Sequence, residues 1–450
     1  MDRKDKEIKL LNILIKGGRI LDPSQGIDMT GDLLIRDSLI SEISKDINPT
    51  QGSHLVEAHG LIVCPGFIDI HCHLREPGEE HKETIATASL AAAKGGFTTL
   101  CAMPNTNPPM DKPNILIDIQ HKANEVGSVN ILPIGCVTEG REGKTLTNMF
   151  ALANAGAIGF SDDGNPIVED DIMLEALLNA KYLGMPIINH CENPYISNNG
   201  VMNQGVVSHA LGMQGWPSEA EEIMVERDIE LSRQTGAKVH LAHISTAGSV
   251  ELIRNAKAKG INVSAEATPH HLTLTEESVR GQAGTGKRYD TNAKVNPPLR
   301  TTADVDAVIQ GLSDGTIDCV ATDHAPHAPN DKNGTFEDAA FGISGLDTAL
   351  GSLLSLVHNR KIPIETLIKS MTYSPASIVN KPDKCSGSLR VNTKADVTIF
   401  DPDIQWQVDT NLFASKGKNS PLDGVFLYGQ VMATIVNGKF VHGSEMARIV

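Results

Sequence analysis

Short apolar runs recur through the middle of this 450-residue chain, and they constrain its fold more than any other feature. Each run is continuous rather than alternating, which is typical of strands buried on both faces of a parallel sheet. We therefore predict strands over Leu61–Ile68, Phe97–Met103, Val129–Val137, Ala157–Phe160, Pro186–Asn189, Lys238–Ala242, Asn262–Ala267 and Asp318–Ala321.

Helical patterns separate most of these runs. We predict helices over His81–Lys94, Lys112–Val126, Glu169–Leu183, Glu219–Thr235 and Ala247–Lys259. Eight strands that mostly alternate with helices over roughly 250 residues are the pattern of an α/β (β/α)₈ TIM barrel. A doubly wound open sheet is the alternative, because periodicity does not show whether a sheet closes.

The two ends of the chain have a different pattern from the middle. Short strand-like runs separated by turn residues fill the first sixty residues and the last sixty-five, and Asn437-Gly438 predicts a tight hairpin turn. We predict one small β-sandwich domain built from both ends, with residues 1–63 and 386–450 enclosing a catalytic barrel at residues 64–385.

Charge and composition exclude several classes of partner. With 39 basic and 55 acidic residues the formal net charge is −16, and aromatic residues make up only 4%. This argues against nucleic acid and an anionic membrane surface as partners. The seven cysteines never occur in CxxC spacing, and we find no secretory leader or membrane-spanning run, so we predict reduced thiols in a cytoplasmic protein.

Possible metal ligands stand at the ends of the predicted strands. The first strand runs into His71-Cys72-His73, and alternate residues of a strand face the same side, so both imidazoles point together. Other strand ends carry Asp162-Asp163, His190, His243 and Asp323. In a barrel these ends meet on one face, and nitrogen and oxygen donors suit Zn²⁺.

This donor set predicts hydrolysis. Four histidines and two carboxylates exceed the needs of one tetrahedral ion, so two metals that share a bridging carboxylate and a hydroxide nucleophile are plausible. Asp323 is the candidate general acid/base, because a free carboxylate beside the hydroxide could take its proton and pass it to a leaving amide nitrogen.

The motifs resemble the dihydroorotase family, of the bacterial type I class in the amidohydrolase superfamily. The resemblance covers essentially the whole chain and rests on PGFIDIHCHLREPG from Pro65 to Gly78 and on SDDG, NHC, LAHIS, DTNAKVNPPLR, ATDHAPH and FGISGLDT. It implies the reversible cyclisation of N-carbamoyl-L-aspartate to L-dihydroorotate in pyrimidine synthesis.

The resemblance also implies roles for the metal ligands. His71 and His73 would hold one zinc ion, His190 and His243 a second, and Asp163 would bridge them, with Asp323 as acid/base that also touches a metal. Many amidohydrolases have a carboxylated lysine at the bridging position, whereas this chain has SDDG and no lysine. Two zinc ions per subunit are expected, and a single zinc is the alternative.

Substrate recognition needs a cation, because both substrates carry a carboxylate. Arg75 lies two residues beyond His73, and its guanidinium could form a bidentate pair with the substrate carboxylate. The further substrate contacts that the resemblance implies are His73, Asn105, Asn292, His327, Phe341 and Gly342.

Other interpretations remain open. Gly281–Lys287 resembles a phosphate-binding loop but lacks the following Ser or Thr, so we interpret it as a glycine-rich loop bordering the site.

The alternative functions are another cyclic-amide hydrolase, such as an allantoinase or dihydropyrimidinase, and an inactive subunit that supports aspartate transcarbamoylase. For the enzyme we expect a homodimer and consider association with that transcarbamoylase.

Overall fold

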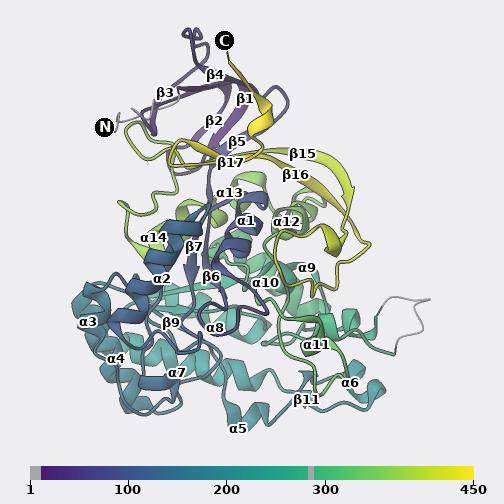
Figure 1. Cartoon of the computed structure of the whole chain (residues 1–450). Coiled ribbons are helices and arrows are strands. Elements are labelled where there is room, and N and C mark those ends of the chain that lie inside the picture. Colours follow the sequence, from purple (N-terminus) through teal and green to yellow (C-terminus); the bar gives the residue numbers. More distant parts are fainter. Residues whose placement is uncertain (1–11, 282–287, 450) are drawn as a thin grey trace, which may run out of the picture.

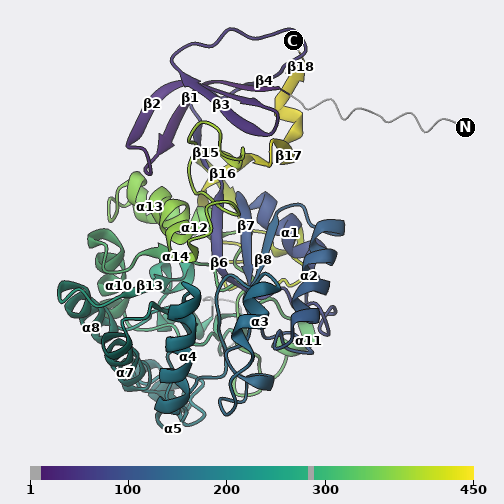
Figure 2. The same cartoon turned by 90° about the vertical axis from the view of Figure 1, so that its left-hand side faces the viewer.

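Strands from both ends of the chain share one sheet in the computed structural model, which describes residues 12–281 and 288–449. The strand order is β17-β16-β15-β5-β1-β2-β3, and β4 pairs with β1 and β18. Figures 1 and 2 show this terminal sheet as a layer at one end of the molecule. Its strands are β1 (Ile13–Asp22), β2 (Ile27–Arg36), β3 (Leu39–Ser44), β4 (His54–Glu57), β5 (Ile62–Pro65), β15 (Val397–Gln407), β16 (Phe426–Val436), β17 (Lys439–His442) and β18 (Ala447–Ile449).

The predicted single strand over Leu61–Ile68 is wrong. Its first half is β5, which pairs with β1 and β15 in the terminal sheet, whereas Phe67 begins the next strand. Gly66 separates the two strands, and a Cβ there would lie 2.2 Å from the Thr98 side chain. Pro65-Gly66, a dipeptide that marks turns, stands in the apolar run at this junction and was the available signal for the division.

Parallel strands form the centre of the molecule. One sheet has the order β6-β7-β8 and another β14-β13-β12-β9, and single bridges of Phe160 to Gly135 and Ile187 join β8 to β9. The predicted strand Ala157–Phe160 is thus reduced to a bridge at Phe160. A bridge between Cys72 and His324 joins the last segment to β6. These strands are β6 (Phe67–Cys72), β7 (Phe97–Ala102), β8 (Asn130–Pro133), β9 (Ile187–Asn189), β12 (Val239–Leu241), β13 (Val263–Ala267) and β14 (Cys319–Val320).

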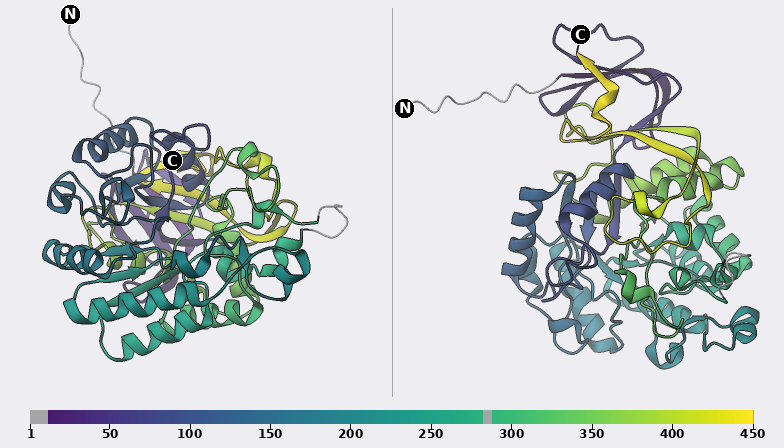
Figure 3. Two further views of the ribbon diagram at one scale, coloured as in Figure 1. Left: turned by 90° about the horizontal axis from the view of Figure 1, so that it is seen from below. Right: turned by 45° about the vertical axis from the view of Figure 1, so that its right-hand side comes forward.

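Helices surround these strands (Figure 3). Threonine caps fix several helix starts, as at Thr84, Thr246 and Thr301, and glycine in the left-handed region ends others, as at Gly184 and Gly236. The longer helices are α1 (Ile85–Lys94), α2 (Pro113–Val126), α4 (Asp170–Leu183), α7 (Glu219–Thr235), α8 (Ala247–Ala258), α10 (Thr302–Asp314), α12 (Ala349–His358), α13 (Ile364–Met371) and α14 (Tyr373–Val379).

Shorter elements lie mainly in the connections that follow the central strands. They are α3 (Met149–Asn154), α5 (Pro194–Ser197), α6 (Val206–Leu211), α9 (Pro269–Thr273), α11 (Pro329–Lys332) and the strands β10 (Met202–Asn203) and β11 (Gly215–Trp216). Most of the glycine-rich segment predicted to border the site, residues 282–287, lies outside the described residues. Over the described ranges, no helix is both long and apolar enough to cross a bilayer.

The terminal sheet packs directly on the base of the central strands. Phe400 of β15 is fully buried and its ring lies 6.2 Å from that of Phe67 on β6, which in turn contacts Phe97 on β7 at 5.7 Å. The Thr398 hydroxyl donates to the Gly96 carbonyl at 2.6 Å. The two parts of the fold therefore share one apolar core at this junction.

We predict that Phe400→Ala destabilises the whole chain by about 3–5 kcal/mol, because it opens a cavity at that junction. Phe426→Ala is the matched control, since Phe426 lies on the adjacent strand β16 and is 59% exposed. Urea denaturation measures both changes. Equal small effects would show that the terminal sheet does not depend on this contact.

Candidate active site

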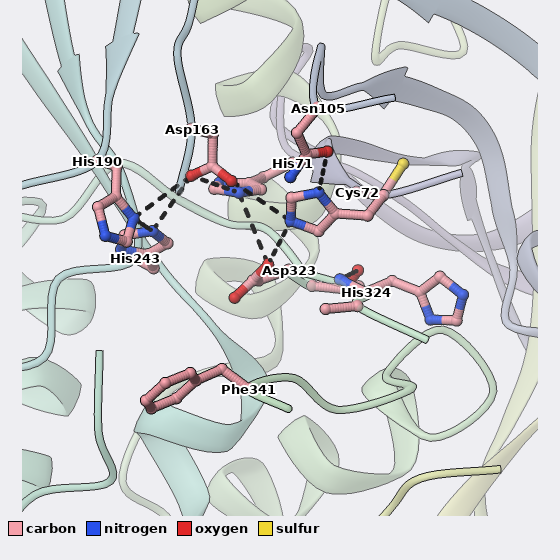
Figure 4. Close-up of polar contacts among 12 residues, drawn as sticks. His71, Cys72, Asn105, Asp163, His190, His243, Asp323, His324 and Phe341 are labelled. Atoms are coloured by element: carbon pink, nitrogen blue, oxygen red, sulfur yellow. Dashed lines mark hydrogen bonds and ion pairs between the residues drawn. The ribbon is translucent and has the colours of Figure 1, made fainter. Parts of the chain in front are cut away.

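Four histidines from three strand ends converge on one carboxylate. Asp163 lies 3.4 Å from His71 Nε2, 3.5 Å from His73 Nε2 and His190 Nδ1, and 3.6 Å from His243 Nε2. Figure 4 shows His71, His190 and His243 around it, with Cys72 pointing away as strand alternation predicts. Two groups of ligand atoms result, both sharing Asp163: one with His71 and His73, the other with His190 and His243.

Three of the imidazoles are oriented from behind by an acceptor. The outer nitrogen of His71 donates to Glu266 at 2.6 Å, and that of His190 donates to Glu192 at 3.0 Å. The outer nitrogen of His73 donates to the Asn105 side-chain oxygen at 2.8 Å. Each of these bonds fixes the tautomer and turns the other nitrogen toward Asp163, as acceptors behind metal-binding histidines do.

The donor atoms fit a bound cation. His71 Nε2 and Asp163 Oδ1 are buried and have no hydrogen-bond partner, and His190 Nδ1 lies only 2.9 Å from His243 Nε2. Inward lone pairs and a buried carboxylate oxygen oppose one another unless a cation lies among them. Imidazole nitrogen and carboxylate oxygen are donors that Zn²⁺ accepts.

Asp323 stands beside this cluster at the end of the last strand segment. Its Oδ1 lies 3.0 Å from His73 Nε2 and 3.7 Å from His71 Nε2. Burial opposes its ionisation, but the neighbouring imidazoles of His73 and His71 hold the pKa of Asp323 below its usual range. The side chain is therefore a carboxylate at neutral pH and can accept a proton.

A cavity of about 240 Å³ opens in front of the histidines. Its volume suits a small ring rather than a polymer. The sequence-predicted residues that line it are His73, Arg75, Asn105, Asp163, His190, His243, Asp323, His327, Phe341 and Gly342. Asn292 does not line it, and Asn296 of the same segment does, so a substrate contact at Asn292 stays a prediction.

Arg75 supplies a cation on the wall of this cavity. It is only 9% exposed, and its Nε donates to the Pro326 carbonyl at 3.2 Å, which leaves other guanidinium donors for a ligand. Neighbouring His327 is neutral at pH 7, because burial and the Arg75 guanidinium lower the pKa of His327 to about 3. Its Nε2 faces the Phe341 carbonyl at 2.8 Å.

Several neighbours of the site point elsewhere. Asp162 accepts from the backbone N–H groups of Val137 and Thr138, so it orders the preceding loop. His324 points away from Asp323 (Figure 4) and contacts Glu83 at 3.4 Å. Asp69 accepts from the backbone N–H groups of His71 and Thr322 and thereby ties the first strand to the last.

Sequence reasoning missed the two acids that hold the ligands. Glu266 lies inside the apolar run that forms β13 and also contacts His240 Nε2 at 3.0 Å. Burial opposes its ionisation, but the neighbouring imidazoles of His71 and His240 lower the pKa of Glu266 to about 2. A lone acid in a buried strand was the available signal. Glu192 follows His190 by two residues and had no such signal.

We predict that Glu266→Gln weakens metal binding by roughly 10–100-fold, because the ligand His71 loses its anionic partner. Competition with a chelator measures the affinity, and far-ultraviolet circular dichroism checks the fold. Glu226→Gln on the exposed face of α7 is the control. Equal affinities in the two variants would remove this role from Glu266.

Known proteins match this chain in sequence. Residues 60–249 match the family model described as dihydro-orotase-like. The chain is 46% identical to a dihydroorotase of Geobacter sp. (strain M21) over 432 residues, covering 96% of this chain and 99% of that one. It is also 46% identical to a dihydroorotase of Pelotomaculum thermopropionicum over 440 residues, covering 97% and 100%.

Solved structures share the same architecture. An L-hydantoinase from Arthrobacter aurescens superposes with a TM-score of 0.85 at 26% identity, over 96% of both chains. A dihydropyrimidinase from Brevibacillus agri superposes with a TM-score of 0.82 at 23% identity, over 96% of this chain and 95% of that one. On the identity to its relatives over nearly full length, the chain belongs to the dihydroorotase family.

Proposed function

We propose that this protein is a zinc-dependent dihydroorotase, which interconverts N-carbamoyl-L-aspartate and L-dihydroorotate in pyrimidine synthesis. One observation carries the proposal: the four histidines and Asp163 converge within 3.6 Å at the floor of a cavity whose wall carries Arg75. The printed names of the relatives support the same reaction.

The architecture supports this reading. We infer that the parallel strands form a closed (β/α)₈ barrel, because the bridge from Cys72 to His324 returns the last segment to the first, which an open doubly wound sheet would not do. The division into residues 1–63, 64–385 and 386–450 is retained as a proposal, with its first boundary inside β5.

The chain's own residues would hold two zinc ions through Asp163. His71 and His73 form one side, and His190 and His243 the other. When bound, zinc supplies an acidified water as nucleophile and positive charge that stabilises the oxygen developing negative charge. Binding of a single ion to one side is the alternative, and metal analysis distinguishes the two.

Asp323 moves the proton in this proposal. Ring opening adds water to the ring carbonyl carbon and breaks its bond to nitrogen, so one proton of the water must reach that nitrogen. Asp323 lies against His73 at the cavity edge, where a carboxylate can accept the proton and donate it to the leaving nitrogen. Arg75 would pair with the substrate carboxylate, with His73, Asn105, His327, Phe341, Gly342 and Asn292 as the further proposed contacts.

A second candidate is a hydantoinase or dihydropyrimidinase, because those enzymes share the architecture. Arg75 favours the dihydroorotase, since hydantoin and dihydrouracil have no carboxylate for a buried guanidinium to bind. An inactive scaffold is disfavoured because every proposed ligand is present.

Cellular context and assembly are part of the proposal too. We expect a cytoplasmic homodimer, and association with aspartate transcarbamoylase as a possible further assembly. Sedimentation of the purified protein with and without a transcarbamoylase tests both expectations.

The decisive assay compares substrates and one variant. We expect the purified protein to open L-dihydroorotate, followed by its ultraviolet absorbance, and to leave dihydrouracil and allantoin unchanged. Asp323→Asn should lower turnover by roughly 100-fold or more, because the general acid/base is lost, while zinc is largely retained. Asp403→Asn, at an exposed position of β15, is the control. Turnover of dihydrouracil but not dihydroorotate would refute the proposed substrate.

A further inference from the structure

Asn419, in the C-terminal part of the chain, bonds to the backbone of residues that line the cavity. It lies between β15 and β16, the long strands that run from the terminal sheet alongside the helices (Figure 3). Its side chain is 4% exposed, although most amide side chains lie in solvent. A buried amide at a loop position needs an explanation in terms of its partners.

Every hydrogen-bonding position of this amide is occupied. Its Oδ1 accepts from the His327 backbone N–H at 2.9 Å and from the Ser344 hydroxyl at 2.8 Å. Its Nδ2 donates to the carbonyls of Ala325 at 3.1 Å and Gly342 at 3.0 Å. The backbone N–H can only donate, so it faces the amide oxygen, and the two carbonyls can only accept, so they face the amide nitrogen. The orientation of the Asn419 amide is therefore determined.

Asn419 thereby joins two stretches that line the cavity. Ala325 and His327 lie at the start of the connection that follows β14, and Phe341 and Gly342 lie near its end. Between Ala325 and His327, which both bond to Asn419, the carbonyl of Pro326 accepts from Arg75 Nε at 3.2 Å. The position of the guanidinium therefore depends in part on a backbone that Asn419 holds, together with the contacts of Arg75 to Glu79 at 3.8 Å and to His327 Nε2 at 3.4 Å.

The segment around Asn419 is itself fixed against the site. A Cβ on Gly417 would lie 2.4 Å from the Pro326 Cβ, so the two backbones are in close contact. The Ser415 hydroxyl donates at 2.5 Å to buried Glu83, which lies just before α1. This hydrogen bond holds the segment around Asn419 in place. The segment therefore packs against Pro326, whose carbonyl accepts the hydrogen bond from Arg75.

We propose that Asn419 is a positioning residue for recognition of the substrate carboxylate, acting through the 325–327 backbone on Arg75. This inference rests on the proposed dihydroorotase function. It gives the C-terminal part of the chain a role in specificity as well as in folding.

The test replaces Asn419 and measures binding separately from turnover. Asn419→Ala should raise KM for L-dihydroorotate, and Kd for its planar analogue orotate, by roughly 10-fold, the order expected when buried hydrogen bonds are lost. The kcat should change by less than about threefold, and zinc content should be unchanged. Asn411→Ala is the control, because Asn411 lies exposed on the same connection.

A merely structural role would give a different result. Partial unfolding lowers the active fraction, so kcat would fall while KM stayed constant, and that outcome would overturn the proposal. In an Arg75→Ala background the Asn419→Ala change should raise KM by a smaller factor than it does in the parent protein, because the route through Arg75 is already removed. If the KM increases of the two single variants instead multiply in the double variant, the proposal is overturned.

Two further observations keep the test decisive. Should Asn419→Ala not fold, Gly417→Ala displaces the same peptide and should raise KM in the same way. An unchanged KM in that variant would count against the proposal. A parent protein without dihydroorotate turnover would instead refute the proposed function, so the two failures are distinguishable.

Discussion

The rest of the structure depends on a group of buried polar atoms around Asp163 that lack hydrogen-bond partners. A buried carboxylate oxygen without a donor faces imidazole nitrogens whose lone pairs point inward, and His190 and His243 approach to 2.9 Å. Outside this ring Glu266, Glu192 and Asn105 hold the outer nitrogens. Such an arrangement is stable only with positive charge at its centre, so the fold preorganises a cation site rather than a hydrophobic core at the ends of its strands.

Parallel strands explain how residues so distant in sequence meet. Each strand ends on the same face, and the chain turns sharply there: Arg75, His243 and Asp323 all have positive φ, at 61°, 34° and 45°. Such conformations in residues other than glycine cost of order 1–3 kcal/mol each, and they persist where surrounding packing determines them. The apolar junction of Phe67, Phe97 and Phe400 lies in the part of the fold that joins the terminal sheet to these strands, away from the ligands.

The sequence predicted most of the side chains that cluster around Asp163 and much of the fold, for a physical reason. Candidate ligands at strand ends follow continuous apolar runs, so His71, His73, His190, His243 and Asp323 could be located from pattern alone, and the α/β class followed from the alternation. Contacts between residues far apart in sequence could not be located in this way. The Glu266 contact to His71 and the Asn419 contacts to the 325–342 connection depend on tertiary packing. The division of Leu61–Ile68 into two strands of different sheets, by contrast, coincides with the turn-forming dipeptide Pro65-Gly66.

Metal removal and return test the central claim most directly. The protein is stripped with a chelator and titrated with Zn²⁺ while bound zinc and dihydroorotate ring opening are followed together. We predict that activity disappears in the stripped protein and returns in proportion to zinc bound at the histidine cluster, with the saturation point giving one or two ions per chain. Full activity in protein that retains no metal would contradict the account.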